Sequence, residues 1–279
     1  MENRIIIEPG AKRKNYWRDL WNFRGLFYFL AWRDVIVRYK QAVIGIAWSV
    51  VKPLLTIIIF IVLGKLLHTA TPPGVPRAIL VCTAILPWQF FSTAFSESSN
   101  SLLANSNLLT KVYFPRLIVP ASTIIVSLID FLTSLGILFL FMIYYRYMPG
   151  WNLILLPVFL LQATMISMGA GIYIAALNVK YRDFKFLVPF IVQFGLYISP
   201  VAFSSDYVYQ SVKIPEAVKY IYSLNPMVGV IDGFRWCILG GKTNLYLPGF
   251  LLSIVVCILS LILGIWYFRK VEKSFADVI

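Results

Sequence analysis

Six runs of mostly apolar residues, each near the length of a membrane-crossing helix, dominate this sequence. A helix needs about 20 such residues to cross the hydrocarbon core of a bilayer. Because 59% of the 279 residues are hydrophobic and only 13% are charged, the chain carries more apolar surface than one soluble core can bury. We therefore predict an all-α integral membrane protein, a single domain over residues 1–279 with six transmembrane helices. The predicted spans are 43–67, 78–99, 117–145, 153–177, 185–203 and 247–268.

The lysine and arginine residues predict how these spans are oriented, because cytoplasmic connections carry an excess of both. Nine lie in the first forty residues, two in 99–116, three in 178–186 and three after residue 268. These segments would share the cytoplasmic side, so residues 1–40 and the tail 269–279 are both expected there. We attribute the net charge of +13 to anionic lipid and topology signalling, and expect no nucleic-acid partner. The polar start of the chain predicts no cleavable signal peptide.

Histidine and cysteine are too few and too scattered for a metal centre. The one histidine, His68, lacks the partners that a histidine metal site or a catalytic triad requires. The cysteines occupy separate apolar contexts without CxxC spacing, so we predict structural thiols at Cys82, Cys237 and Cys257.

The fragment "GGKT" at 240–243 resembles the end of a phosphate-binding loop, but that loop requires glycine where this chain has Trp236. No HExxH, GxSxG or paired-carboxylate pattern is present either. We therefore expect a non-enzymatic chain with no catalytic residue and no bound metal or cofactor. The energy for any transport would come from elsewhere.

Two segments outside the spans have their own patterns. Residues 15–22 place Asn15, Arg18, Asp19 and Asn22 on one helical face and Trp17, Leu20 and Trp21 on the other, which predicts an amphipathic helix in the membrane interface. Arg24 would snorkel from its apolar side.

The segment 226–241 is too short for a seventh span. With the residues before it, we predict two short re-entrant helices between spans five and six, broken at Pro215 and at Asn225-Pro226. Asp232 and Arg235 lie on one face of the second helix, where they can pair. A plain interfacial loop is the alternative.

Few ionisable residues occur inside the spans, and such residues are often functional. For Lys52, Glu97 and Asp130, we expect a structural ion pair between the lysine and one carboxylate; a proton relay is the alternative. Aromatic and polar residues also gather in spans two and five. Ordinary bundle packing and interfacial belts explain most of the aromatic residues, and the alternative is a passage in which a sugar chain stacks on the rings while its hydroxyls meet the polar groups. The candidates to line such a passage are Trp88, Phe90, Phe91, Ser92, Ser96, Asn100, Phe190, Gln193, Phe194 and Tyr197.

Five stretches in order resemble the transmembrane subunit of bacterial ABC exporters for polysaccharides, the type-2 permease class. They are "WRDVIVRYKQAVIGIAWSVVKPLL" (32–55), "LPWQFFSTAFSESSNSLLANSNLLTKVYFPRLIVP" (86–120), "NVKYRDFKFLVPFIVQFGLYISPV" (178–201), "LNPMVGVIDGFR" (224–235) and "RKVEKSFADVI" (269–279). The ending is most similar to the O-antigen and lipopolysaccharide branch.

The resemblance implies a homodimer in the bacterial inner membrane, bound to two soluble ATPase subunits that hold ATP and Mg. It implies a cytoplasmic coupling helix that docks on the ATPase, at Asn107, Lys111, Val112, Tyr113, Phe114, Pro115 and Arg116. Here Tyr113 and Phe114 would be the anchors, Lys111 and Arg116 would form the charged rim, and Pro115 would end the helix. The alternative is a positively charged loop that only sets the topology.

The same resemblance assigns an interface helix with Trp17, Arg18, Trp21 and Arg24, and an outer gate with Pro200, Pro226, Asp232 and Arg235. Lys52 departs from the family pattern, because we expect a neutral residue there.

The implied substrate is a glycan on an undecaprenyl diphosphate carrier. Arg33, Arg38 and Lys40 lie just before span one, where they can attract its headgroup or serve only as topology signals. Alternatives are a type-2 permease for a teichoic acid, capsule chain, drug or lipid, a membrane-bound glycosyltransferase, and a secondary transporter. A glycosyltransferase would need an acidic cytoplasmic cluster, and the charged turn at 180–185 offers only Asp183.

Overall fold

The computed structural model describes residues 16–40, 45–66, 71–211, 214–272 and 275. All regular elements in these ranges are helices: α1 (Tyr16–Asn22), α2 (Arg24–Lys40), α3 (Gly45–Leu66), α4 (Arg77–Ala104), α5 (Ser106–Lys111), α6 (Ile118–Tyr144), η1 (Trp151–Leu155), α7 (Leu156–Lys180), α8 (Phe184–Ile198), α9 (Asp206–Tyr209), α10 (Glu216–Ser223), α11 (Pro226–Ile238) and α12 (Leu247–Val271). Asn15, His68 and most of the tail after residue 272 lie outside the described residues.

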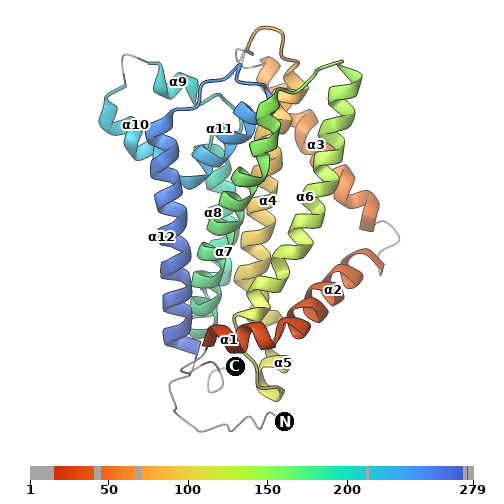
Figure 1. The fold of residues 1–279 in the computed structure, drawn as a ribbon, viewed down its shortest axis with the longest axis vertical. Coiled ribbons are helices and arrows are strands. Elements are labelled where there is room, and N and C mark those ends of the chain that lie inside the picture. Colours follow the sequence, from red (N-terminus) through yellow and green to blue (C-terminus); the bar gives the residue numbers. More distant parts are fainter. Residues whose placement is uncertain (1–15, 41–44, 67–70, 212–213, 273–274, 276–279) are drawn as a thin grey trace.

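The long helices form one bundle around α4, which packs against α6 and α7, while α12 packs on the far side of α7 (Figure 1). Four helices have the length and hydropathy of membrane spans: α4, α6, η1 with α7, and α12. They coincide with predicted spans two, three, four and six, which confirms a multi-pass membrane protein. Helix α3 occupies the range of span one, with Pro53 inside it.

Helix α8 is shorter than the predicted fifth span. Its 15 residues rise about 22 Å, less than the roughly 30 Å hydrocarbon core. The charged turn predicted before it is present, because α7 ends at Lys180 and α8 begins at Phe184. The six-span count therefore stays a prediction.

Small residues let α7 and α12 touch backbone to backbone. A Cβ atom added to Gly264 of α12 would lie 2.2 Å from the carbonyl oxygen of Gly169 of α7. A Cβ on Gly169 would in turn lie 2.6 Å from the backbone nitrogen of Leu261. Close contact through small residues is the usual way that helices associate in lipid, where no hydrophobic gain drives packing.

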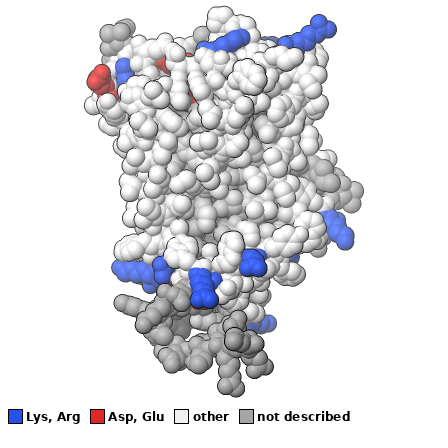
Figure 2. Space-filling view, in the orientation of Figure 1, with Lys and Arg blue, Asp and Glu red and all other residues white. Residues whose placement is uncertain are grey.

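The two ends of the bundle differ in construction. One end, the α5 end, holds α1, α5, the start of α6 and the end of α12, and the other, the α11 end, holds α9 to α11 (Figure 1). Figure 2 shows lysine and arginine side chains at both ends of the visible face, separated by a broad band without charged residues. This distribution is that of a bundle whose middle lies in hydrocarbon.

Helices α1 and α2 run across the α5 end, and α2 then leans along α6 (Figure 1). Tyr16 and Leu30 are buried in a cluster with Phe114 and Phe268, whereas Trp17 and Trp21 are exposed. The amphipathic element is therefore longer than the predicted residues 15–22, since a second helix continues it to Lys40.

Candidate functional site

Helix α4 is the most buried of the four candidate spans, and its one uncovered face in the middle of the bundle is polar. Between Val81 and Leu102, every residue of α4 that is not buried belongs to a set of six at helical spacing. We call this set the polar stripe; it consists of Gln89, Ser92, Thr93, Ser96, Glu97 and Asn100.

The polar stripe is unsuited to contact with lipid, because hydrocarbon cannot satisfy amide, hydroxyl and carboxylate groups. Some of its groups bond to the backbone of α4 itself: the hydroxyls of Ser92 and Thr93 donate to the carbonyl of Gln89, and the Asn100 amide donates to that of Ser96. Other groups, including the partly exposed Glu97 carboxylate, remain accessible. A surface of this kind fits a water-filled passage or an interface with another polar surface.

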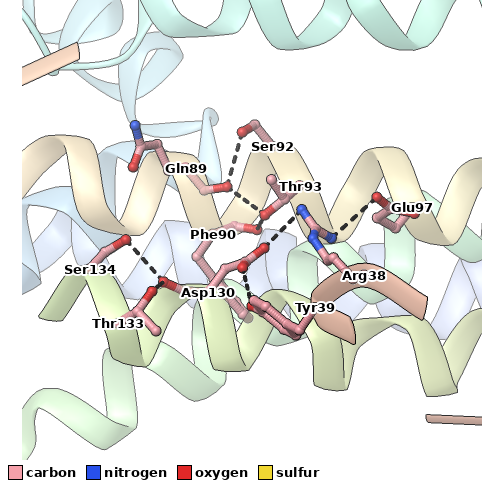
Figure 3. Close-up of polar contacts among 10 residues, drawn as sticks. All are labelled: Arg38, Tyr39, Gln89, Phe90, Ser92, Thr93, Glu97, Asp130, Thr133 and Ser134. Carbon is pink, nitrogen blue, oxygen red and sulfur yellow. Dashed lines mark hydrogen bonds and ion pairs between the residues drawn. The ribbon is translucent and has the colours of Figure 1, made fainter. Parts of the chain in front are cut away.

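A charge cluster joins the polar stripe to two other helices (Figure 3). Arg38, near the end of α2, lies 2.9 Å from an oxygen of Asp130 of α6 and 3.5 Å from an oxygen of Glu97. The hydroxyl of Tyr39 also donates a hydrogen bond to Asp130. With one guanidinium between two carboxylates, this cluster ties α2 to the middle of the bundle.

The prediction that Lys52 pairs with Glu97 or Asp130 was wrong. Lys52 is exposed on α3, and Arg38 takes the place that we expected it to fill. The reason is the geometry of α2, which rises obliquely and carries Arg38 to the depth of Asp130 (Figure 1). The sequence does not reveal this contact, because Arg38 and Asp130 lie on different helices and no residue spacing within one helix brings them together.

The predicted lipid-headgroup residues are mostly engaged within the protein. Arg33 donates to Asp34, with a shortest contact of 2.7 Å, and to the side-chain oxygen of Asn105 at 2.8 Å. Arg38 is bound as described above, and Lys40 is exposed. In this conformation a lipid phosphate would compete with carboxylates for both arginines.

The predicted passage-lining residues fall into separate environments. Ser92, Ser96 and Asn100 belong to the polar stripe, to which the structure adds Gln89 and Thr93. Phe90 is a correction: it is 2% exposed, and its ring packs edge-on against Phe131, so it belongs to the core.

The remaining aromatic candidates divide around α8. Trp88 and Phe91 of α4 line an apolar groove together with Phe194 of α8. Phe190, Gln193 and Tyr197 are exposed and lie outside that groove. Their 100° steps place these three on the neighbouring face of α8.

The predicted coupling segment projects from the α5 end (Figure 1). Asn107, Lys111, Val112 and Tyr113 are exposed, but the helix ends at Lys111 and not at Pro115, and Val112 is extended. Phe114 is a second correction, because it is 4% exposed within the cluster that holds Tyr16 and cannot be an anchor for a partner.

Arg116 also differs from its predicted place on an exposed rim. Its backbone N–H donates to the Glu272 carboxylate at 2.9 Å, and its guanidinium donates to the Glu272 carbonyl at 2.7 Å. The segment after α5 is thereby fastened to the end of α12.

The four residues predicted for the interface helix, Trp17, Arg18, Trp21 and Arg24, are all exposed at the α5 end. The guanidinium carbon of Arg24 lies 5.8 Å from the centre of the Trp21 ring, within cation–π range. Paired indole and guanidinium groups at the edge of an apolar bundle suit a position at lipid headgroups.

The predicted outer gate consists of three short helices, α9, α10 and α11, where two were expected. The predicted breaks are confirmed: Pro215 precedes α10, and Asn225 caps α11 by accepting from the Met227 N–H at 3.1 Å. The Asn225 amide also donates to the Ser199 hydroxyl at 2.9 Å, just before the buried Pro200.

Asp232 and Arg235 of α11 are buried, and each binds the segment after α8. The Ser205 hydroxyl donates to Asp232 at 2.5 Å, and Arg235 donates to the Phe203 carbonyl at 3.0 Å. Burial raises the pKa of the Asp232 carboxyl to about 7, although Arg235 and the Ser205 hydrogen bond both lower it. The direct pairing that their spacing predicted is absent: no ion pair joins Asp232 to Arg235 among the described residues, and each side chain instead binds the loop that follows α8.

Comparison with known proteins places this geometry in a family. A model of the ABC-2 type transporter matches residues 25–239, from α2 to just past α11. The chain belongs to this family. The matched residues include the polar stripe, the charge cluster and the two buried charged residues of α11.

Named relatives are similar over most of their length. Two proteins of Klebsiella pneumoniae, each called O-antigen export system permease protein RfbA, are 28% and 27% identical to this chain over 257 and 254 residues. Each alignment covers 88% of this chain and 92% of the relative. The protein of the same name from Myxococcus xanthus is 27% identical over 218 residues, covering 78% and 82%.

Proposed function

We propose that this chain is the passage-forming subunit of an ATP-driven exporter that moves an O-antigen-like polysaccharide, linked to undecaprenyl diphosphate, across the inner membrane. It would act as a homodimer with two soluble ATPase subunits, which hold ATP and Mg. Both termini would lie in the cytoplasm, so that the α5 end meets the ATPase. The names of the relatives support the cargo class, and the family supports the ATPase partner.

The polar stripe is the observation that carries this proposal. A hydrated glycan needs hydrogen-bonding groups along its path, and the stripe supplies them on the helix at the centre of the bundle. Two copies facing each other would enclose the stripes and remove them from lipid. The exposed Phe190 and Tyr197 of α8 would add ring faces for sugars.

The docking surface for the ATPase would be the exposed part of the α5 segment, with Val112 and Tyr113 as its apolar contacts and Lys111 at the rim. Arg116 and Phe114 would support it from inside, through Glu272 and the cluster at the α5 end. A movement of the ATPase subunit would then be transmitted directly to α6 and α12.

Replacing the two central hydroxyls of the stripe tests the proposal. We expect Thr93→Leu/Ser96→Leu to reduce polysaccharide reaching the cell surface about 10-fold or more, because leucine removes the hydrogen-bonding groups and narrows the passage. Surface polysaccharide is measured in cells whose own permease gene is deleted and replaced by each variant.

The matched control is Leu140→Val, on an exposed apolar position of α6. Membrane level and co-purification of the ATPase subunit should be equal in both variants. Normal export by the stripe variant would contradict the proposal. Loss of small-compound or lipid transport, with polysaccharide export intact, would favour the alternative permease class instead.

A further inference from the structure

A groove opens between α8 and α12, with α4 and α7 as its floor. It has a volume of about 890 Å³, within the range of about 300–1,000 Å³ typical of ligand pockets. Its lining is almost wholly apolar, with Trp88, Phe194 and Trp266 among the large side chains. Phe194 and Trp266 are also well exposed, so the groove is open to the surroundings of the bundle.

The groove exists because small residues fix where α8 sits. A Cβ atom added to Gly195 would lie 2.6 Å from the Trp88 ring, so α8 rests directly on α4 at that level. Helix α12 is held against α7 through Gly264 and Gly169. Since each helix is anchored to a different neighbour, space remains between them.

The groove has a basic end. Lys270 follows the lining residues Trp266 and Tyr267 on α12, and its ammonium lies 5.3 Å from the Trp266 ring centre. Lys180 ends α7, two helical turns beyond the lining residue Tyr173 and on the same face, and its ammonium lies 4.9 Å from the Tyr181 ring centre. Both lysines are exposed at the α5 end, and neither makes an ion pair among the described residues.

An apolar groove with an aromatic belt and two lysines at one end complements an anionic lipid. We propose that the groove binds one anionic phospholipid of the cytoplasmic leaflet, with acyl chain in the groove and phosphate near Lys180 and Lys270. Charge complementarity favours this occupant over an apolar face of a second copy, which would leave both lysines unpaired. Mass action favours it over a lipid-linked glycan, because phospholipid is the bulk component of the membrane.

This inference uses the membrane orientation of the proposed function but not its cargo. A bound phospholipid would fill the space between α8 and α12 and hold α8 at a fixed distance from α12. The contact matters because α8 has few buried residues of its own, with Val188 alone buried between Phe184 and Ile198.

Bromine on an acyl chain quenches tryptophan fluorescence on contact. All proteins in this test carry phenylalanine in place of the six tryptophans outside the groove, several of which are exposed, so that quenching reports occupancy through Trp88 and Trp266. Full-length protein is reconstituted in phosphatidylcholine vesicles that contain a minor fraction of brominated phosphatidylglycerol or, separately, brominated phosphatidylcholine. We expect the apparent affinity for phosphatidylglycerol to be about 10-fold higher, given two lysines near the headgroup. Lys180→Gln/Lys270→Gln should remove that preference, and Ala170→Phe, which fills the groove, should remove the quenching.

Each control makes the same kind of substitution at a position outside the groove. Lys219→Gln/Lys242→Gln removes two lysines from the α11 end, and Leu161→Phe enlarges an exposed residue of α7. Neither should alter the quenching. Equal quenching by the two brominated lipids, or unchanged quenching in Ala170→Phe, would overturn the proposal. Displacement of phosphatidylglycerol by a small amount of undecaprenyl phosphate would assign the groove to the lipid carrier instead.

Discussion

The charge cluster at Arg38 and the charged residues of α11 use the same side-chain types in opposite environments. The Glu97 side chain is 50% exposed and its oxygen lies 3.5 Å from Arg38, whereas Asp232 is 6% exposed and accepts a 2.5 Å hydrogen bond from Ser205. The first cluster borders the polar stripe, and the second lies inside the α11 end.

This difference in exposure means that the residues of the charge cluster can exchange their partners, whereas the buried residues of α11 cannot. An exposed pair gains little from its attraction, because water solvates both charges when they part. A buried charge without its partner has no such alternative, so its neighbours fix its position. The charge cluster is therefore an accessible site beside the polar stripe, whereas the α11 residues hold the segment between α8 and α11 in place.

The largest expected effect is that of Asp232→Ala. At pH 8, where the wild-type carboxyl is mostly ionised, this change removes the negative charge that offsets the nearby buried Arg235 guanidinium, and the acceptor for Ser205. We expect a loss of about 3–5 kcal/mol of stability, measured as a lower thermal unfolding midpoint of the purified protein. Asp232→Ala/Arg235→Met should recover part of it, and equal stability of the single variant and wild type would break the comparison.

A smaller effect is expected from Arg38→Gln. Among the described residues, this change leaves the partly buried Asp130 with Tyr39 as its remaining side-chain hydrogen-bond donor, at a cost of about 1–2 kcal/mol. The same unfolding measurement checks it, with Lys65→Gln on the exposed end of α3 as the control. A loss as large as that of Asp232→Ala would mean that the cluster is a buried structural pair.

The smallest effect on stability is expected from Glu97→Gln. Because this carboxylate is half exposed and its contact with Arg38 is long, the change should cost less than about 0.5 kcal/mol. Polysaccharide export should nevertheless fall several-fold, since the stripe loses its one carboxylate. Unfolding and export are measured in parallel, and a variant with normal export would remove Glu97 from the proposed passage.

The sequence predicted the spans better than the contacts between them. The ranges of four spans and the breaks at Pro215 and Asn225 follow from apolar length and turn residues, which act locally. The sequence did not predict the length of α2, the early end of α5 or the burial of Phe114, because each of these depends on packing at the α5 end. Gln89 and Thr93 had a signal that we missed, since they continue the helical spacing of Ser92 and Ser96.

By itself, the sequence determined that this chain is a helical membrane protein, and it contains the stretches that resemble the permease family. Composition and run length are sufficient for that conclusion, because hydrocarbon excludes unpaired backbone groups and selects helices. Only the tertiary structure decided which polar face stays uncovered, that Arg38 rather than Lys52 meets Asp130 and Glu97, and that a groove separates α8 from α12. These features depend on the angle and depth at which distant helices meet, and glycine contacts and oblique packing set that geometry without leaving a local pattern.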